Sequence, residues 1–594
     1  MKKRGFTLVE ILVGLAVFAV ISAGIYTTIS YVYKISYLSR VRVLETQLAN
    51  ERLEITRNLP YEKIGTVGGV PNGILEQTTT TFRNGIAFQI ATTIRNIDDP
   101  FDGTVGGSPS DSSPADYKLA EARVICLSCA TVQIQPVVLS TIVSPKGLEG
   151  ASQNGSLFIN VFDAAGISIP GAGVEITNNK VSPAIHLLDV TNANGDLQII
   201  DTPTSTEGYQ IHVSKNGYTN DYTVAASESN PNPLRPPATV ISQTVTSISF
   251  TIDKVSSVNL STINYQCGVI PDVGFIVSGS KLLGVNPNVY RYSQSFSTND
   301  LGQRQLNNLE WDTYDFSLTG AAYDIAGAIP SLPLSLNPGT AQDLSIILKP
   351  HTANSLLLTV KDSGTKLPLT NATATLSRAG ENYVLVTGRG YARQTDWSGG
   401  GGQEAFGDET KYASQDGGVE TNNPAGDLKL KKLGGKYYWS GSLISSTFDF
   451  GQPTAFTNII WEPIAQPPQA GADSLKFQIA TSASSSPANW DFLGPDGTAA
   501  SFYTASNTNI NALHNGHRYL RYKVFLSTDN QNFSPQLSEA AFSFTSGCTP
   551  PGQAFFSGLS SAVYDLTIEL PDYQTVNTTV EAAGRTQTEV LMSP

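Results

Sequence analysis

Residues 1–33 read MKKRGFTLVE ILVGLAVFAV ISAGIYTTIS YVY. No charged residue occurs from Ile11 to Tyr33. At a rise of about 1.5 Å per residue, a helix of that length crosses a hydrocarbon core of about 30 Å. The three basic residues at positions 2–4 predict a cytoplasmic N-terminus, so everything after Tyr33 is expected on the far side of the membrane.

Glu10 stands where the apolar stretch begins. A carboxylate in the middle of a membrane helix costs about 2.5–3.5 kcal/mol on insertion scales, which makes Glu10 a functional candidate. A secretory signal peptide would share the basic start, but no clear A-x-A cleavage site follows a short apolar core. An ordinary membrane anchor with a chance glutamate is the remaining alternative.

Lys-Arg-Gly at 3–5, followed by Phe-Thr-Leu-Val-Glu at 6–10, resembles the leader and mature start of type IV prepilins and type II secretion pseudopilins. The resemblance covers ten residues and the apolar run, and its motif is specific. It implies that a prepilin peptidase cuts between Gly5 and Phe6 and methylates Phe6. It also implies that Glu10 balances the terminal amine of another pilin subunit inside a filament.

The helix is expected to continue out of the membrane to about residue 59, where Pro60 ends it. Apolar residues recur there on a 3.6-residue period, which predicts one stripe that packs on a head domain. The stripe consists of Tyr37, Val41, Leu44, Leu48 and Ile55.

Strand patterns follow from residue 60 to 149, with Asn84-Gly85 between two of them as a two-residue hairpin signal. This order predicts a pilin-like β head. In the same region Cys126 and Cys129 form a CxxC in an exported segment, which favours a local disulfide. A zinc site is the alternative, although no second CxxC or paired histidine follows at ligand spacing. The pairing of Cys267 and Cys548 stays open.

Residues 150–225 resemble carboxypeptidase regulatory-like domains, which are small Ig-like sandwiches, and close with Lys-Asn-Gly-Tyr at 215–218. A second unit of this pattern spans 240–350. A third is discontinuous, 354–397 plus 548–594, and an all-β, jelly-roll-like domain at 398–547 interrupts it. The expected fold class is therefore mainly β with one long N-terminal α-helix, a pilin-like α+β head and a string of Ig-like β-sandwiches, the last one interrupted.

Five aspartates crowd a Gly/Ser/Pro-rich loop in the head. Such a loop could hold structural Ca²⁺ through carboxylates and carbonyls, but a solvated turn is the simpler interpretation because the ligand spacing of an EF-hand is missing. No other cofactor or metal is implied. The aspartates are Asp98, Asp99, Asp102, Asp111 and Asp116.

The composition argues against several function classes. The net charge of −13 does not suit nucleic acid as a partner. Only five histidines occur, and the His514-x-x-His517 pair lacks the glutamate of a zinc protease. No nucleophile elbow, P-loop or dinucleotide motif is present, so no catalytic residue is assigned and an enzyme is not expected.

Three functions remain. The first is a large minor or tip type IV pilin, held in the bacterial inner membrane as a precursor and then assembled at the cell surface, with its β-sandwiches as stalk and adhesive module. The second is a type II secretion pseudopilin, and the third is a membrane-anchored surface adhesin outside a pilus. Expected partners are the prepilin peptidase, other pilin subunits, the inner membrane, and surface glycans or proteins.

Overall fold

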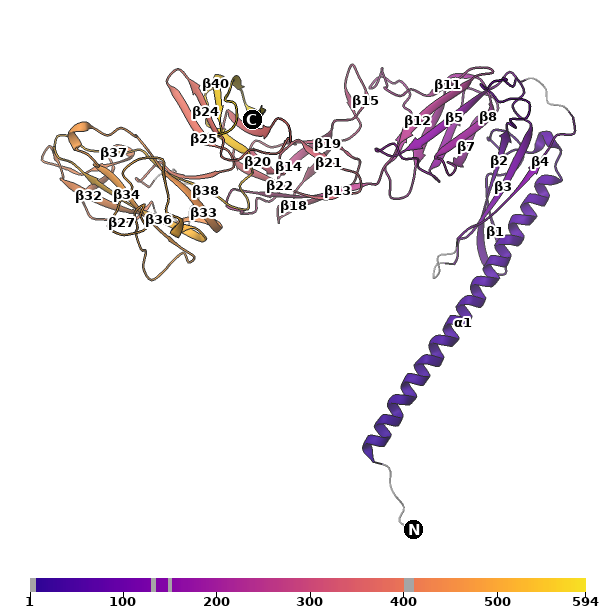
Figure 1. Cartoon of the computed structure of the whole chain (residues 1–594), viewed down its shortest axis with the longest axis horizontal. Helices are drawn as coiled ribbons and strands as arrows, with labels where there is room; N and C mark the ends of the chain where they lie inside the picture. Colours follow the sequence, from indigo (N-terminus) through magenta and orange to yellow (C-terminus); the bar gives the residue numbers. More distant parts are fainter. Residues whose placement is uncertain (1–6, 130–134, 148–151, 400–410) are drawn as a thin grey trace, which may run out of the picture. The chain divides into compact units, whose positions relative to one another are not determined.

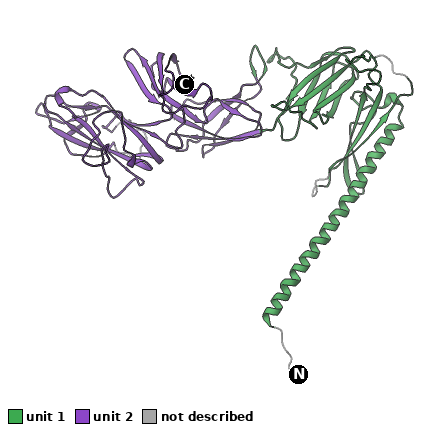
Figure 2. Cartoon of the chain, viewed as in Figure 1, with its two compact units in different colours: residues 1–255, 282–289 green, residues 256–281, 290–594 purple. Residues whose placement is uncertain are grey.

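The computed structural model describes residues 7–129, 135–147, 152–399 and 411–594. The chain forms two compact units, one of residues 1–255 and 282–289 and one of residues 256–281 and 290–594 (Figure 2). We call them unit 1 and unit 2 and describe each by itself.

Unit 1 begins with one continuous helix, α1 (Leu8–Arg57), as predicted (Figure 1). Its first half carries exposed apolar side chains, and its second half packs on the head. The buried stripe is rotated relative to the predicted one, because Tyr37 and Ile55 are 38% and 46% exposed. The inward face instead consists of Val41, Leu44, Glu45, Leu48, Ala49, Leu53 and Thr56.

The head is an antiparallel sheet in the order β1-β2-β3-β4. Asn84 and Gly85 both have positive φ (50° and 78°), the backbone of a tight two-residue hairpin. Residues of β2 alternate between buried and half-buried, so one face of the sheet forms a core with α1. The strands are β1 (Thr78–Arg83), β2 (Ile86–Ile97), β3 (Tyr117–Cys126) and β4 (Val137–Val143), and a short 3₁₀ helix, η1 (Tyr61–Lys63), follows α1.

The rest of unit 1 is a two-sheet sandwich around one apolar core. Its first and last strands, β5 and β12, pair in parallel. One sheet contains β5 (Gly155–Phe162), β8 (Asp196–Thr202) and β12 (Val245–Thr251), and the other contains β6 (Gly173–Asn178), β7 (Ile185–Val190), β9 (Ser205–Ser214), β10 (Asp221–Tyr222) and β11 (Ala238–Val240). The short strands β15 (Leu282–Gly284) and β16 (Val289–Tyr290) pair with each other.

Unit 2 opens with a second two-sheet sandwich, and its first and last strands, β13 and β22, are again parallel neighbours. One sheet contains β13 (Ser256–Ile263), β18 (Gln303–Leu309), β20 (Tyr323–Ile329) and β22 (Ala341–Pro350). The facing sheet contains β14 (Gly274–Gly279), β17 (Ser293–Ser297), β19 (Asp312–Leu318) and β21 (Leu334–Leu336).

The third sandwich draws its strands from both sides of a long insertion, and β23 and β42 are its parallel first and last strands. One sheet contains β23 (Ser355–Asp362), β39 (Gln553–Ser557) and β42 (Arg585–Met592). The other contains β24 (Thr373–Arg378), β25 (Glu381–Val386), β40 (Ala562–Glu569) and β41 (Val576–Ala582).

The insertion has a large aromatic core that continues into Tyr265, Ala326 and Ile347 of the second sandwich. Its first strand, β26, pairs with its last, β38, so both ends of the insertion lie side by side. The main sheet contains β26 (Gly390–Gln394), β27 (Tyr412–Gln415), β32 (Ser440–Ser445), β33 (Phe448–Glu462), β34 (Leu475–Ser482), β35 (Thr508–Asn509), β36 (His517–Ser527) and β38 (Glu539–Thr545). Smaller elements are β28 (Val419–Asn422), β29 (Ala425–Leu430), β30 (Lys432–Leu433), β31 (Lys436–Tyr437), β37 (Gln536–Leu537), η2 (Pro468–Ala470) and η3 (Ala512–His514).

The same glycine turn recurs in the three sandwiches. Gly195, Gly302 and Gly552 have φ of 77°, 66° and 66° and lie against the first strand of their own sandwich. A Cβ on Gly195 would come within 2.5 Å of the Val161 carbonyl oxygen, so only glycine fits there without a backbone shift.

Candidate assembly and interaction sites

The processing residues Gly5 and Phe6 lie outside the described residues. Directly after them, Thr7 and Glu10 form a capping box at the start of α1. The Thr7 backbone N–H donates to Glu10 Oε2 (2.9 Å), and the Glu10 N–H donates to Thr7 Oγ1 (3.3 Å). The T-x-x-E signal was present in the sequence but missed there. Glu10 therefore has a local role that exists within a single subunit.

The first part of α1 is apolar and uncovered. Its most apolar 18-residue window has a mean hydropathy of 2.5, and none of it is buried in this chain. Leu8, Phe18 and Val20 are each more than 70% exposed. Such a surface needs a lipid or protein environment to cover it.

Glu45 is a buried carboxylate in the contact between α1 and the head sheet. It is 0% exposed, and neither carboxylate oxygen has a hydrogen bond that meets normal geometry. The nearest cation is Arg42, at 3.8 Å (Nη1 to Oε2), which is itself half exposed. Burial raises the pKa of Glu45, and the Arg42 charge and the Cys126 backbone N–H only partly oppose this.

Cys126 and Cys129 are joined as a disulfide at the end of β3, with Cα atoms 5.7 Å apart. The Tyr37 hydroxyl lies 3.4 Å from Cys129 Sγ, so the bridge contacts α1 as well as the sheet. The second disulfide, Cys267–Cys548, joins positions 281 residues apart, just after β13 and just after β38. The sequence had no local signal for this pairing.

Within unit 1, polar contacts tie the head to the sandwich that follows it. Arg95 on β2 forms a two-pronged ion pair with the buried Asp189 on β7, with Nε to Oδ2 at 2.8 Å. Gln77 donates to the His186 carbonyl and accepts from the Leu188 N–H (3.0 Å). Bidentate Arg–carboxylate pairs are stronger and more directional than simple ion pairs.

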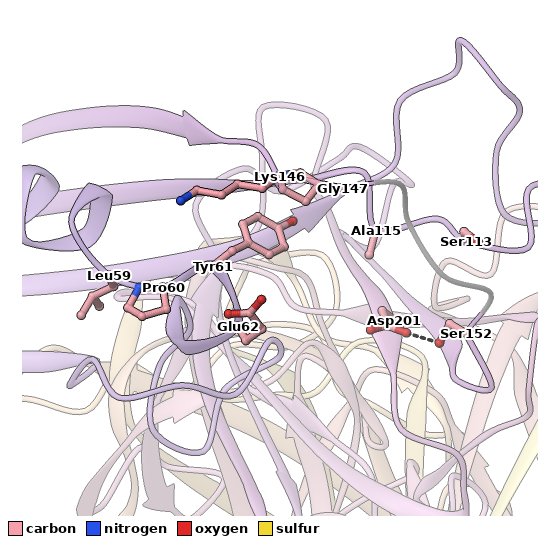
Figure 3. Close-up of a pocket in the computed structure, with 11 residues that line it drawn as sticks. Leu59, Pro60, Tyr61, Glu62, Ser113, Ala115, Lys146, Gly147, Ser152 and Asp201 are labelled. Carbon is pink, nitrogen blue, oxygen red and sulfur yellow. Dashed lines mark hydrogen bonds between the residues drawn. The ribbon is translucent and has the colours of Figure 1, made fainter.

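A cleft of about 660 Å³ opens beside η1 in unit 1 (Figure 3). Tyr61, Glu62, Lys146 and Asp201 contribute polar groups to it. The buried Lys118 ammonium donates to the carbonyls of Tyr61 (2.9 Å), which lines the cleft, and Ile64 (2.7 Å), and burial lowers its pKa. Lys118 on β3 thereby holds the η1 turn in place, which is a structural role.

The aspartate loop brings three carboxylates together. One oxygen each of Asp102, Asp111 and Asp116 lies within 4.8 Å of the others. Asp98 accepts a hydrogen bond from the Val105 N–H (2.8 Å). Its pKa is raised, mainly by burial and further by the charges of its acidic neighbours. The distances between these oxygens allow shared cation ligands, while exposed acidic groups also occur without one.

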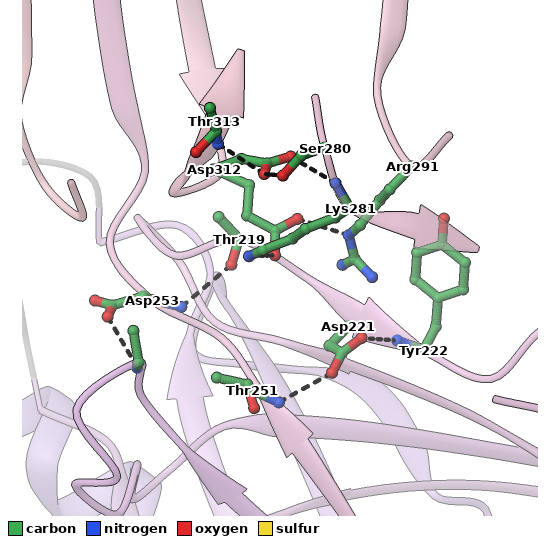
Figure 4. A network of polar contacts seen from close by, with 12 residues as sticks. Thr219, Asp221, Tyr222, Thr251, Asp253, Ser280, Lys281, Arg291, Asp312 and Thr313 are labelled. Atoms are coloured by element: carbon green, nitrogen blue, oxygen red, sulfur yellow. Dashed lines mark hydrogen bonds and ion pairs between the residues drawn. The ribbon is translucent and has the colours of Figure 1, made fainter. Parts of the chain in front are cut away.

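Two polar networks near the middle of the chain hold loops in place (Figure 4). In unit 1, the buried Asp221 pairs with Arg235 and accepts from the Thr251 N–H (2.9 Å). In unit 2, Glu310 accepts from Lys281 (2.7 Å) and Arg291 (2.6 Å).

His514 and His517 both lie against the Thr481 hydroxyl, at 3.0 and 2.8 Å from their Nδ1 atoms. His514 is buried, and burial, with a smaller effect of His517, lowers its pKa to about 4. No third metal ligand joins them among the described residues.

The comparisons with known proteins agree with the N-terminal motif. Residues 1–26 match the prokaryotic N-terminal methylation motif. A search of curated protein sequences found no match. Among solved structures, the Bacillus anthracis TIE protein is 12% identical and aligns over 53% of this chain and 66% of its own, with a TM-score of 0.15.

Two pilins of Gram-positive bacteria are also similar. The shaft pilin SpaA of Lactobacillus rhamnosus GG is 14% identical over 34% of this chain and 98% of its own, with a TM-score of 0.14. The minor pilin GBS52 of Streptococcus agalactiae is 10% identical over 33% and 96%, with a TM-score of 0.17. At these scores the likeness carries no argument of its own. The methylation motif and the uncovered apolar helix do. The chain carries a prepilin-type N-terminal signal, followed by a helix long and apolar enough to anchor the precursor in the inner membrane.

Proposed function

We propose that this chain is a large minor pilin of a type IV pilus, positioned at the tip, whose β-sandwiches form a stalk and whose inserted domain binds to surfaces. Prepilin peptidase would cut between Gly5 and Phe6, and Glu10 would pair with the amine of a neighbouring subunit. The observation that carries the proposal is the division of α1. Its first half is apolar and uncovered, while its second half, from Val41, is packed on the chain's own head.

The sandwiches suit a stalk because of their topology. In each one the first strand lies next to the last and parallel to it, as for β5 and β12. The chain therefore enters at one end of a sandwich and leaves at the opposite end. In the first two sandwiches, tension between these ends loads the hydrogen bonds of the parallel pair together rather than one after another. We regard the sandwiches as Ig-like modules on this topology.

The size of the chain supports a tip position. Residues beyond the head greatly outnumber those of α1 and the head together, and a subunit at the end of a filament has room for them. A pseudopilus subunit works beneath a secretion channel and needs no such extension, and an adhesin outside a pilus needs no processed N-terminus.

The test is the location of the protein in sheared, purified pili. Immunogold labelling with an antibody to the inserted domain should decorate filament ends at one site per filament. Labelling along the whole shaft would contradict the tip position. Absence from pili, with the protein retained in the membrane fraction, would contradict the minor-pilin function itself.

A further inference from the structure

We propose that the outer face of β34 and β36 in the inserted domain binds an acidic polysaccharide, one whose sugars carry carboxylates. This inference rests on the proposed surface-binding function and names the ligand class. The face combines three cations with three aromatic rings, and we call it the cation–aromatic face. It consists of Lys476, Arg521 and Lys523 with Trp490, Phe502 and Phe525.

Strand register places the cations outside. Leu520, Tyr522 and Val524 on β36 are fully buried, so Arg521 and Lys523 between them point away from the core. Lys476 on β34 lies directly opposite Phe525 on β36. Gln478, the next residue on the same side of β34, is buried and donates to the Ala499 and Ser501 carbonyls, so the open part of this side is β36 together with Lys476. Alternate residues of one strand, such as Arg521 and Lys523 on β36, are spaced by about 6.6–6.8 Å.

Each cation is held over a ring. Lys476 Nζ lies 4.4 Å from the centroid of Phe502, and Lys523 Nζ lies 4.9 Å from that of Phe525. The Arg521 guanidinium lies 4.9 Å from the Trp490 ring and donates from Nε to Thr447 Oγ1 (2.9 Å), so it holds the ring and is not counted as a free cation. Phe502 and Phe525 touch edge to face at 5.2 Å, which fixes both rings. A cation–π contact positions an ammonium without using its three N–H donors, which stay available for a carboxylate.

The charges around the face favour an anionic ligand. Among the described residues, neither Lys476 nor Lys523 has an ion pair or a hydrogen bond from Nζ to a protein acceptor. Of the three carboxylates Asp416, Asp449 and Asp496, only Asp449 is paired with a cation, Arg518 (2.7 and 2.9 Å). Asp416 and Asp496 accept from the neutral donors Ser442 Oγ (2.9 Å) and Thr498 N–H (2.8 Å) and keep their charges, so the two unpaired lysines alone favour an anionic ligand.

The ring content and the modest number of cations favour a polysaccharide over nucleic acid. Apolar C–H groups of sugars pack on the aromatic surface that the cations leave open, while carboxylates on separate sugars meet the two lysines. Single-stranded nucleic acid also stacks on aromatic rings, but it carries a phosphate at every nucleotide. Two lysines without a protein partner, on a chain of net charge −13, match sparse charges better than dense ones.

The experiment measures binding of the detergent-solubilised full chain to immobilised polygalacturonate. Its methyl ester, which has the same sugar backbone without the charges, and a dT oligonucleotide serve as the other probes. The variants are K476Q/K523Q, the charge-preserving K476R/K523R, and K432Q/K436Q as a matched control. The control removes two lysines from the β30–β31 hairpin of the same domain, one of which also lies over a ring, that of Tyr437 (5.0 Å).

We expect binding to polygalacturonate and weaker binding to its ester. K476Q/K523Q should weaken binding at least about tenfold, because two charge-assisted contacts are lost. K476R/K523R and K432Q/K436Q should stay within about twofold. The proposal is overturned if the chain does not bind polygalacturonate, or binds its methyl ester equally well. It is also overturned if K476Q/K523Q and K432Q/K436Q lose the same affinity, or if only the oligonucleotide binds. Presence in sheared pili is measured separately, so the minor-pilin function can stand when this inference fails.

Discussion

Glu10 is held by Thr7 at the start of α1, so its carboxylate can serve its own helix as well as a neighbouring subunit. Two variants separate these roles. Glu10→Gln keeps a capping-box residue but removes the charge, whereas Thr7→Ala removes the cap, at about 1 kcal/mol, and keeps the charge.

If Glu10 pairs with the amine of another subunit, Glu10→Gln should abolish incorporation into sheared pili at equal membrane abundance. Leaving a buried charge without its partner costs about 3–5 kcal/mol. Thr7→Ala should still be incorporated. If Thr7→Ala were excluded from pili while Glu10→Gln was incorporated, Glu10 would act in helix capping alone.

Glu45 gives a second prediction at the residue scale. Because burial raises its pKa above the ordinary 4.5, the unfolded chain ionises this carboxyl first as pH rises. The head should therefore lose stability as pH rises from about 4.5 to the raised value, and keep that loss above it. Below 4.5 the penalty is absent.

Glu45→Gln should remove this pH dependence, and Glu45→Met should also remove the buried polar group, for a gain of roughly 1–3 kcal/mol at neutral pH. Hydrogen exchange of β3 amides reports the stability of this region directly. Exchange that is slower in wild type than in both variants at neutral pH would show that Glu45 stabilises the head.

At the scale of elements, each sandwich has a buried tyrosine that hydrogen-bonds a backbone carbonyl a few residues earlier. Tyr314 donates to Glu310 O (2.8 Å), Tyr564 to Ser560 O (3.3 Å), and Tyr209 to Pro203 O. These bonds close the corner before the strand, as in the tyrosine corner of β-sandwiches.

Tyr314→Phe should destabilise the second sandwich by about 1–1.5 kcal/mol, because the hydroxyl's hydrogen bond is lost while the ring stays packed. Tyr290→Phe is the control, since Tyr290 is 49% exposed and should change stability by less than about 0.5 kcal/mol. Hydrogen-exchange rates of the β19 amides would distinguish the two variants. Equal rates in the two variants would mean that the corner contributes nothing.

Local elements were predictable from the sequence because their signals are local. The Asn84-Gly85 hairpin and the single long helix depend on residues close in the chain, and both are confirmed. The face of α1 was predicted less well. Counting apolar residues left out Glu45, Ala49 and Thr56, whose burial depends on the sheet that covers them. The proposed module boundaries stay predictions.

Long-range features had weaker signals. The repeat pattern grouped 354–397 with 548–594, but nothing in either segment specified that β23 and β42, more than two hundred residues apart, pair in parallel. The cation–aromatic face was predictable from the sequence only in part. Alternation placed Tyr519, Arg521 and Lys523 on one face, but the rings of Trp490 and Phe502 come from a loop that only the fold brings there.

At the scale of the whole molecule, the Cys267–Cys548 disulfide joins two residues of unit 2 that are 281 positions apart in sequence. Chain-entropy arguments give such a bridge at most about 5–6 kcal/mol of stabilisation. The double variant C267S/C548S should therefore lower the denaturation midpoint of unit 2. The head of unit 1, with its own disulfide, should be unaffected. Lower denaturation midpoints in both unit 2 and the head would indicate general misfolding rather than the loss of this disulfide.

The most direct test of the central claim, that this chain is a processed pilin subunit, is mass spectrometry of its N-terminal peptide from assembled filaments. The account predicts a peptide that begins at Phe6 and carries one methyl group on its amine. A peptide that begins at Met1, or a cut between residues 25 and 35, would contradict the pilin assignment and leave an ordinary anchor or a secretory signal in its place.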